Sequence, residues 1–440
     1  MVHNSFTFTA EEHEVRCMLR AVNPRKAAGP DGIPGRVLKD CTDQLDGVFT
    51  RIFSQSLSQS TVPPCLKSST IIPLPKTPHI SSLNDYWPVA LTLVVMKCWS
   101  TGDAVATALN ASLSHLEQQG SYVRLLFVDF SSLFNTILPY KLMDKLGDLG
   151  LPHSTCMWIY SFLTGRSQRV RVGHHTSTVL SISTGSPQGC VLSPLLYTLF
   201  THDCTPTHHS NTIVKFADDI IVAGLISGGD ESAYRDEVER LTVWCRENNL
   251  LLNTSKTKEL VIDYRRKKTD ILPLIISGDC VERVADFCLL GIYIEEDLTW
   301  SVNTSELLKK AQQRLHFLRV LRKNNITQRL LVSFYRCSIE SLLKYCICVW
   351  YTSCTVAQRK ALQRVINMAQ KIIGCPLLNL EELHSSHCLK IAQNIIKDTS
   401  HPGHHLFELL PSAVERQSTW SLGGGMVFLT ATLFCASNQA

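Results

Sequence analysis

The sequence lacks a long hydrophobic run. The longest apolar stretch near its end, residues 426–436, is too short to cross a bilayer. Residues 1–15 are polar and acidic and offer no apolar signal segment. We therefore expect an intracellular protein that has no membrane partner.

The sequence also lacks any Cys-x-x-Cys spacing, although it holds 17 cysteines. Scattered cysteines do not indicate a disulfide framework, so we expect reduced thiols that serve mostly in packing. The C-terminal part gathers cysteine and histidine residues in a spacing that fits no common zinc pattern. Zinc binding is left open for these residues: Cys375, His384, His387, Cys388, His401, His404 and His405.

A strong charge of either sign is missing as well. The formal net charge of +5 permits a polyanionic partner but does not demand one. A hydrophobic content of 45% with 18% charged residues is typical of a globular protein. No internal repeat occurs, and a chain of 440 residues should contain about two to four subdomains.

Two adjacent carboxylates, Asp218 and Asp219, lie between two β-branched, apolar runs in residues 212–224. Such runs indicate strands, so the pair falls at a strand–turn–strand tip. Aspartate is a poor strand former, and like charges raise each other's pKa. A bound divalent cation would resolve both problems, because hard oxygen ligands suit Mg²⁺. The alternative is an ordinary hairpin turn that uses aspartate for its turn chemistry.

A third carboxylate, Asp129, lies near the end of residues 122–130, a nearly continuous apolar run. The run indicates a strand that is buried on both faces, where a carboxylate is costly unless it is paired or binds a metal. Adjacent strands of one sheet could bring Asp129 to the Asp218–Asp219 pair and form a two-metal site. Such a site can activate a 3′-hydroxyl and stabilise leaving pyrophosphate. Two Mg²⁺ ions are the natural choice, with Mn²⁺ as the alternative.

Basic residues suggest contacts to phosphate in two places. Lys67 and Lys76 flank a predicted strand and could grip a phosphate, although two solvated surface lysines are the alternative. After Trp300 the spacing predicts a helix whose apolar stripe is flanked by basic residues, which suits a nucleic-acid groove. The stripe consists of Leu307, Leu308, Ala311, Leu315 and Leu318, and the basic residues are Lys309, Lys310, Arg314, Arg319, Arg322 and Lys323.

Three segments, 128–136, 186–194 and 216–219, resemble in this order the palm motifs of reverse transcriptases from LINE-type non-LTR retrotransposons. Segments 26–32, 252–258 and 289–291 extend the resemblance, which covers most of the chain. The resemblance implies an RNA-directed DNA polymerase with an RNA template, a DNA primer and deoxynucleotide triphosphates as partners. It also implies an α/β right-hand fold, with an antiparallel palm sheet flanked by helices and a helical C-terminal part. The implied divisions are shortened fingers at 1–118, palm with part of the fingers at 119–300, a helical thumb at 301–375 and an extension at 376–440, loosely ordered after about 410.

The resemblance further implies a role for each matching position. Asp129 and Asp218 would bind the two metal ions, and Asp219 would support the site. Phe134 would be the steric gate that packs where a ribose 2′-hydroxyl would project, so that deoxynucleotides are preferred.

The remaining roles concern nucleotide, template and primer. Gln188 and Gly189 would lie along the template and the incoming nucleotide. Lys256 would approach the triphosphate, and Leu290–Gly291 would form the primer grip.

The chain departs from the family in three respects. Trp87 stands where the family has an arginine that would hold the triphosphate, and tryptophan cannot replace that charge. The family also carries a longer fingers segment between Cys98 and Ser100, and an endonuclease that we expect to be absent from this chain. Two alternatives follow: a catalytically inactive remnant that only binds RNA or hybrid duplex, and an RNA-directed RNA polymerase, against which Phe134 argues.

Overall fold

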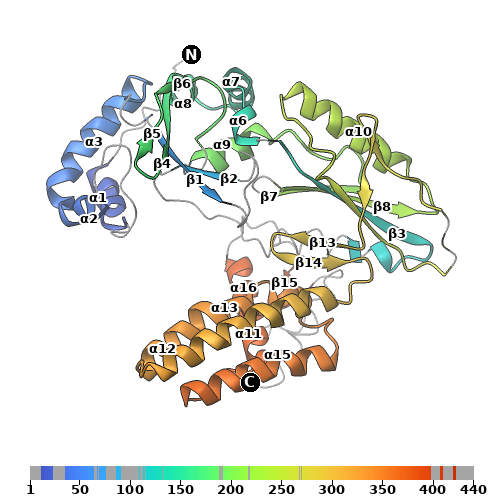
Figure 1. Ribbon diagram of the computed structural model, residues 1–440. Helices are drawn as coiled ribbons and strands as arrows, with labels where there is room; N and C mark the ends of the chain where they lie inside the picture. Colours follow the sequence, from blue (N-terminus) through green and yellow to red (C-terminus); the bar gives the residue numbers. More distant parts are fainter. Residues whose placement is uncertain are drawn as a thin grey trace. The chain divides into compact units, whose positions relative to one another are not determined.

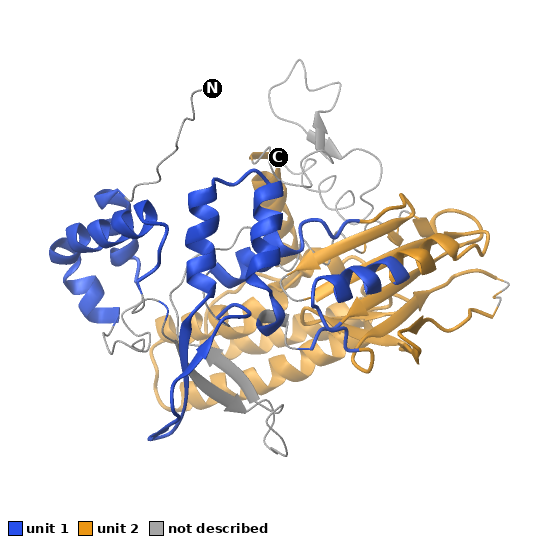
Figure 2. Cartoon of the chain, turned by 90° about the horizontal axis from the view of Figure 1, so that it is seen from above, with its two compact units in different colours: residues 1–98, 129–205, 239–253 blue, residues 99–128, 206–238, 254–440 orange. Residues whose placement is uncertain are grey.

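The computed structural model describes residues 11–22, 35–63, 69–75, 86–90, 115–131, 133–187, 192–216, 219–266, 270–397, 407–409 and 420–422, together with residues 67, 109, 112, 113 and 268. The chain divides into two compact units (Figure 2). The first comprises residues 1–98, 129–205 and 239–253, and the second comprises residues 99–128, 206–238 and 254–440. Within the described ranges, no helix is both long enough and apolar enough to cross a membrane.

The first unit combines short helices with a five-stranded sheet in which β1 pairs in parallel with β4 and antiparallel with β2. Its strands are β1 (Ser69–Pro75), β2 (Tyr86–Ala90), β4 (Arg166–Val172), β5 (His175–Thr176) and β6 (Leu180–Ile182). Its helices are α1 (Glu12–Arg20), α2 (Gly35–Asp40), α3 (Thr42–Ser58), α6 (Leu133–Thr136), α7 (Pro139–Asp148), α8 (His153–Leu163) and α9 (Leu192–Phe200). The strand that the sequence predicts between Lys67 and Lys76 is confirmed as β1.

The second unit is built on a five-stranded sheet in the order β12-β9-β3-β8-β7 (Figure 1). The strands are β3 (Ser121–Val128), β7 (Asn211–Phe216), β8 (Asp219–Ser227), β9 (Lys258–Ile262) and β12 (Glu282–Arg283). The central strand β3 pairs antiparallel with both β8 and β9, and every one of its residues is buried. This confirms the strand predicted from the continuous apolar run. The helix α10 (Ser232–Glu247) follows β8 in the chain.

One buried residue of β3 is charged. Arg124 is fully buried, and its guanidinium forms two parallel hydrogen bonds of 2.8 Å with the carboxylate of Glu259 on β9. A third hydrogen bond of 2.7 Å runs to Glu231, which immediately precedes α10. Tyr122 donates to Glu231 and Tyr234 donates to Glu259, so both carboxylates are neutralised and hydrogen-bonded. This network joins β3, β9 and the start of α10. Removing one of its charged members would leave an opposite charge in the core without that partner.

Gly224 of β8 lies directly opposite Arg124 and leaves room for the ring of Tyr234. A Cβ atom at this position would lie 2.7 Å from Tyr234 Cγ, and that ring is buried. We therefore expect Gly224→Ala to lower the free energy of unfolding by about 1–3 kcal/mol through overpacking. Urea denaturation measures the loss, with Gly47→Ala on α3 as the control, since no atom lies within 4 Å of its added Cβ. Equal stabilities of the two variants would contradict the packing argument.

A hairpin and a bundle of helices complete the second unit. The hairpin consists of β13 (Asp286–Leu289) and β14 (Ile292–Glu295), and β14 leads into α11 (Ser301–Lys323). The further helices are α12 (Gln328–Tyr335), the π-helical turn Arg336–Glu340, α13 (Ser341–Lys344), α14 (Ile347–Trp350), α15 (Val356–Ile373) and α16 (Leu380–Lys397). The predicted apolar stripe of α11 is confirmed, except that Leu308 is half-buried. Two further pairs of short strands are β10 (Ile275–Ile276) with β11 (Asp279–Cys280) and β15 (Phe407–Leu409) with β16 (Trp420–Leu422).

The expectation that all thiols are reduced is wrong for one pair. Cys348 on α14 and Cys388 on α16 form a disulfide, with Cα atoms 5.9 Å apart. The two helices pack against each other, so residues 40 positions apart in the chain come together. Near this pair His384 is buried, and burial lowers the pKa of its imidazole to about 4, so it is neutral at pH 7.

Candidate functional site: one edge of the central sheet

The candidate site lies at the edge of the sheet where β3 ends. Val128, the last residue of β3, pairs with Ile220 of β8. Asp219 is the first residue of β8 and pairs with Phe216, the last residue of β7, so Asp219 lies at this same edge. Asp129 is the next residue of the chain after Val128. The strands β3 and β8 that the sequence predicts next to these carboxylates are therefore neighbours in one sheet, and the convergence of the carboxylates themselves stays a prediction.

The segment that follows β3 is held by its own backbone contacts. The amide of Asn253 donates to the carbonyl of Asp129 at 2.9 Å, and the amide of Ser131 donates to the carbonyl of Leu251 at 2.9 Å. Phe130 forms a β-bridge with Leu252 between these two bonds. Hydrogen bonds thus fix the backbone at Asp129 to the segment that precedes Lys256.

The donor chemistry of this edge fits a divalent cation. One carboxylate oxygen of Asp129, Oδ2, is buried, and Asp219 is half-buried. Carboxylate oxygens are hard ligands of the kind that Mg²⁺ and Mn²⁺ take in proteins. Asp218, the third predicted ligand, lies outside the described residues. Among the residues that are described, no group of three or more His, Cys, Asp or Glu side chains is placed to hold a metal ion, and this includes the C-terminal cysteines and histidines up to residue 397.

Several predicted contact residues cannot be placed. Gln188, Gly189 and Lys76 lie outside the described residues, as does the side chain of Phe134, whose backbone is part of the short helix α6. Lys256 is described, and its residue is exposed in the turn before β9.

The predicted primer-grip residues form the tip of the β13–β14 hairpin. Leu290 has φ 48° and Gly291 has φ 86°, the two left-handed positions of a type I′ turn. The ring of Phe287 on β13 stacks on that of Phe127 on β3, with centroids 4.0 Å apart and planes 7° from parallel. Phe127 lies two residues before Asp129, so an aromatic pair anchors the hairpin to the strand that leads to the candidate carboxylate.

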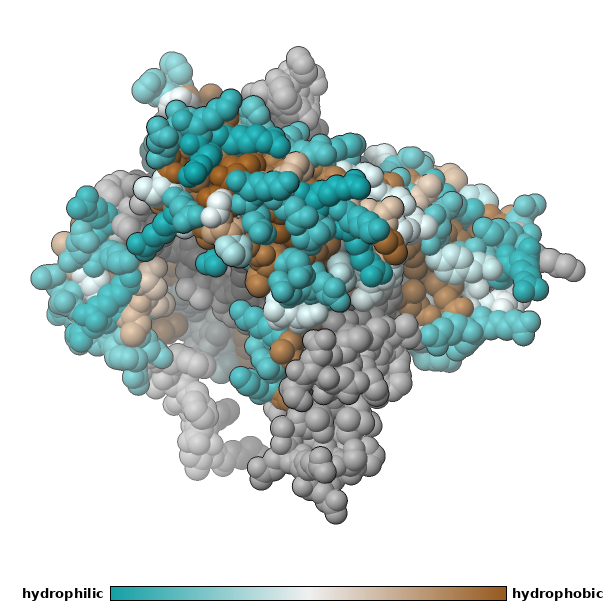
Figure 3. All heavy atoms as spheres, turned by 90° about the horizontal axis from the view of Figure 1, so that it is seen from below, coloured by the Kyte–Doolittle hydropathy of each residue, from teal (hydrophilic) through white to brown (hydrophobic). Residues whose placement is uncertain are grey.

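The helical bundle is strongly basic. Between residues 301 and 373 the sequence holds thirteen Lys and Arg residues against two acidic residues. Of the basic side chains predicted on α11, Lys309 pairs with Glu306 at 2.6 Å and Arg314 donates to the carbonyl of Ser338. The other four are exposed: Lys310, Arg319, Arg322 and Lys323. In the coloured part of Figure 3, hydrophilic side chains cover much of the face, with apolar side chains between them. The exposed basic side chains of α11 suit a polyanion.

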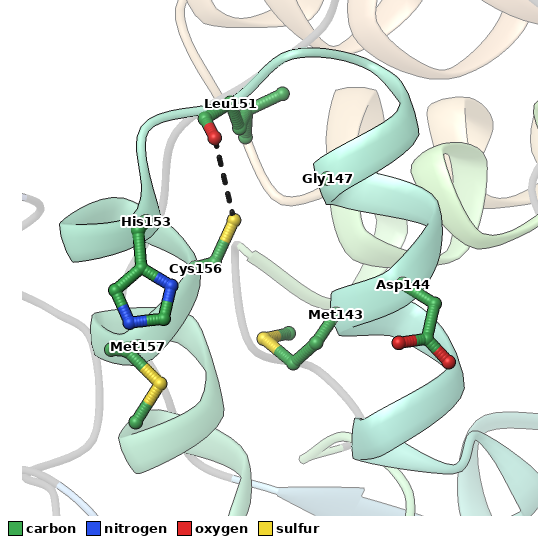
Figure 4. Close-up of a pocket in the computed structure, with 7 residues that line it drawn as sticks. All are labelled: Met143, Asp144, Gly147, Leu151, His153, Cys156 and Met157. Atoms are coloured by element: carbon green, nitrogen blue, oxygen red, sulfur yellow. Dashed lines mark hydrogen bonds between the residues drawn. The ribbon is translucent and has the colours of Figure 1, made fainter.

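A hollow of about 340 Å³ in the first unit lies between α7 and α8 (Figure 4). There Cys156 Sγ donates to the carbonyl of Leu151 at 3.8 Å, and burial raises the pKa of its thiol. The lining holds none of the residues predicted for catalysis: Met143, Asp144, Gly147, Leu151, His153, Cys156 and Met157. The hollow therefore does not include any residue for which the sequence predicts a catalytic role.

Sequence reasoning missed the network around Arg124. The sequence did contain a signal. Arg124 lies inside an apolar run that is predicted to be buried on both faces, and a buried charge requires a partner. The partners Glu231 and Glu259 lie 107 and 135 residues away, so the sequence alone could not identify them.

Comparison with known proteins places these features in a family. Residues 57–318, more than half of the chain, match the family model described as reverse transcriptase (RNA-dependent DNA polymerase). A shorter match at residues 300–341 is to the N-terminal region of alkylated DNA repair protein alkB homolog 8.

Curated relatives come from mobile elements. The chain is 25% identical over 282 residues to a probable RNA-directed DNA polymerase from transposon BS of Drosophila melanogaster, covering 60% of this chain and 31% of the relative. It is 23% identical over 407 residues to the RNA-directed DNA polymerase from mobile element jockey of Drosophila funebris, covering 82% and 44%. The chain thus spans less than half the length of these relatives.

Two telomerase structures are also similar. The apo telomerase of Candida tropicalis, truncated from its C-terminal domain, gives a TM-score of 0.37 at 9% identity over 57% of this chain and 59% of that one. The Candida albicans telomerase in complex with a fragment of telomeric RNA gives 0.32 at 12% identity over 74% and 57%. The resemblance stated from the motifs and the right-hand fold class it implies are confirmed by the family match. The chain belongs to the reverse transcriptase (RNA-dependent DNA polymerase) family, and its relatives are the enzymes of LINE-type non-LTR retrotransposons.

Proposed function

We propose that this chain copies an RNA template into DNA by adding deoxynucleotides to a primer 3′-hydroxyl. The observation that carries the proposal is the shared sheet edge, at which β8 begins with Asp219 and from which the chain leaves β3 into Asp129. Family membership supports the same reaction. The proposed division into fingers, palm and thumb follows residues 1–118, 119–300 and 301–375, with the extension at 376–440.

The proposed chemistry is an in-line displacement in which the primer 3′-oxygen bonds to the α-phosphorus and pyrophosphate leaves. Asp129, Asp218 and Asp219 would hold two Mg²⁺ or Mn²⁺ ions. When bound, these ions lower the pKa of the attacking hydroxyl and neutralise charge that develops on the leaving group. The chain's own task is to hold these carboxylates in place, and the hydrogen bond that the backbone carbonyl of Asp129 accepts from Asn253 supports this for Asp129.

Other residues would position the substrates. We assign the triphosphate to Lys256, with Lys76 as a second phosphate contact, and the template strand to Gln188 and Gly189. An ammonium near the triphosphate offsets the phosphate charge and can donate a proton to departing pyrophosphate.

Phe134 is proposed as the residue that excludes ribonucleotides. A bulky ring beside the sugar leaves no room for a 2′-hydroxyl, so we expect Phe134→Ala to raise the efficiency of ribonucleotide incorporation by about 10²-fold, with little change for deoxynucleotides. Single-nucleotide extension with dGTP and with GTP, on the same primed RNA template, measures the ratio of their kcat/KM values. A Phe134→Ala protein that still excludes ribonucleotides as strictly as the wild type would refute the gate.

The experiment that tests the proposed function compares product synthesis from the two nucleotide sets. Extension of a DNA primer on RNA with deoxynucleotides and Mg²⁺ supports the proposal. Extension with ribonucleotides alone supports the RNA-polymerase alternative, and salt-dependent hybrid binding without extension supports the inactive remnant.

A further inference from the structure

The tip of the β13–β14 hairpin is held by a residue of the helical bundle. The hydroxyl of Tyr345 donates a hydrogen bond to the carbonyl of Leu290. The ring of Tyr345 lies against Gly291, because a Cβ built on that glycine would lie 3.5 Å from the ring atom Cε1. Both residues of the turn are therefore contacted by one tyrosine that lies 55 positions further along the chain.

This contact bears on a backbone that needs support. Leucine rarely adopts a positive φ, and Leu290 has φ 48°. Such a conformation persists where its surroundings determine it. The turn between Leu289 and Ile292 is thus held by the contact with Tyr345 as well as by the backbone pairing of β13 with β14.

Tyr345 is itself fixed in place. It follows the π-helical turn Arg336–Glu340 and α13, at a point where the helix is interrupted. Its carbonyl accepts a hydrogen bond of 3.0 Å from Nε1 of Trp350, which is fully buried. π-helical turns often occur at functional sites, since they redirect a side chain from the regular helical path.

The other end of the hairpin is fixed to the catalytic strand. Phe287 stacks on Phe127, two residues before Asp129, so the hairpin is anchored at β3 and at its tip. Packed rings at β3 and one hydrogen bond at the tip thus hold the hairpin within the second unit. A displacement of about 1 Å in a group that positions a substrate can cost about 10²-fold in rate.

We propose that Tyr345 is a positioning residue that fixes the Leu290–Gly291 turn against the primer terminus. The inference rests on the proposed function, in which this turn contacts the primer. Tyr345 acts through the turn and does not itself touch the reacting atoms.

The test uses Tyr345→Phe, which removes the hydrogen bond and keeps the ring. Tyr335→Phe is the matched control, since the Tyr335 hydroxyl is buried in the same bundle and has no hydrogen-bond partner among the described residues. The probe is a fluorescently labelled RNA–DNA duplex with a recessed DNA 3′ end, and a blunt duplex of the same sequence serves for comparison. Fluorescence anisotropy gives the dissociation constant of each.

We expect Tyr345→Phe to weaken binding of the recessed duplex about five- to tenfold relative to Tyr335→Phe, the factor that one hydrogen bond represents. Binding of the blunt duplex should be unchanged, whereas a general loss of structure would weaken the binding of both duplexes. In extension assays the KM for primed template should rise by the same factor, with the deoxynucleotide KM unchanged. Equal affinities of the two variants for the recessed end would overturn the inference. A wild-type protein that binds recessed ends through Tyr345 but does not extend them would contradict the proposed function alone.

Discussion

Replacing Asp129 with asparagine should reduce primer extension by about 10³-fold while leaving the binding of hybrid duplex unchanged. The substitution preserves shape but removes the negative charge on which a divalent cation depends, and a neutral amide is a weak ligand for Mg²⁺. The backbone carbonyl of residue 129, which accepts from Asn253, is retained, so the segment should keep its course. Gel-resolved extension of a labelled primer measures the loss, and anisotropy measures the binding.

The control for this substitution is Asp148→Asn. Asp148 is an exposed aspartate at the end of α7, so the change in formal charge is the same and no loss of extension is expected. If Asp129→Asn retained more than about a tenth of wild-type extension, a metal-binding role for this carboxylate would be untenable.

The second large effect concerns stability and not chemistry. Arg124→Met should lower the free energy of unfolding by about 3–5 kcal/mol, because it leaves the carboxylate of Glu259, which is 1% exposed, with only the more distant and partly exposed Arg283, at 3.5 Å, as a counter-ion. Methionine fills much of the space of the arginine side chain, so the loss of stability results from the missing charge and not from a cavity. Urea denaturation of the two proteins at pH 7 measures the difference.

Arg235→Met provides the control. Arg235 also pairs with Glu231, at 2.7 Å, but its side chain is one-third exposed, so a loss below about 1 kcal/mol is expected. A loss of stability of similar size in both variants would show that burial does not determine how much an ion pair contributes to the free energy of unfolding.

The same network predicts a pH dependence. Burial alone would raise the pKa of the Glu231 carboxyl, but hydrogen bonds from Tyr122 and Arg235 and the charge of Arg124 hold that pKa below its ordinary value of 4.5. A group whose pKa is lowered on folding stabilises the fold above its unfolded pKa and loses that contribution as the pH falls through its folded pKa. Wild-type stability should therefore fall below about pH 4.5, and Arg124→Met should show a smaller fall.

Local patterns identified the elements that carry the site. The apolar run before Asp129 and the paired runs around Asp218 predicted β3 and the β7–β8 hairpin, because a strand buried on both faces needs a continuous apolar sequence. The stripe of α11 followed from helical spacing in the same way. Ordered motifs then assigned roles that no single pair of aspartates could have assigned.

Contacts between residues that are far apart in the chain could not be predicted from the sequence alone. Residues 166–172 form β4, whose pairing with β1 depends on residues about a hundred positions away. Helix α16 was not predicted, since its apolar positions are interrupted by histidine and polar residues that are buried only by packing on its neighbours. The Cys348–Cys388 bond and the hydrogen bond from Tyr345 to Leu290 likewise depend on how the bundle folds back.

The central claim is that this chain makes DNA on an RNA template, and one measurement tests it most directly. A labelled DNA primer annealed to RNA is incubated with the protein, Mg²⁺ and the four deoxynucleotide triphosphates, and the products are resolved by length. The account predicts a ladder of extended products that disappears with Asp129→Asn and with chelation of Mg²⁺. An unextended primer in the presence of a wild-type protein that binds the hybrid duplex would contradict it.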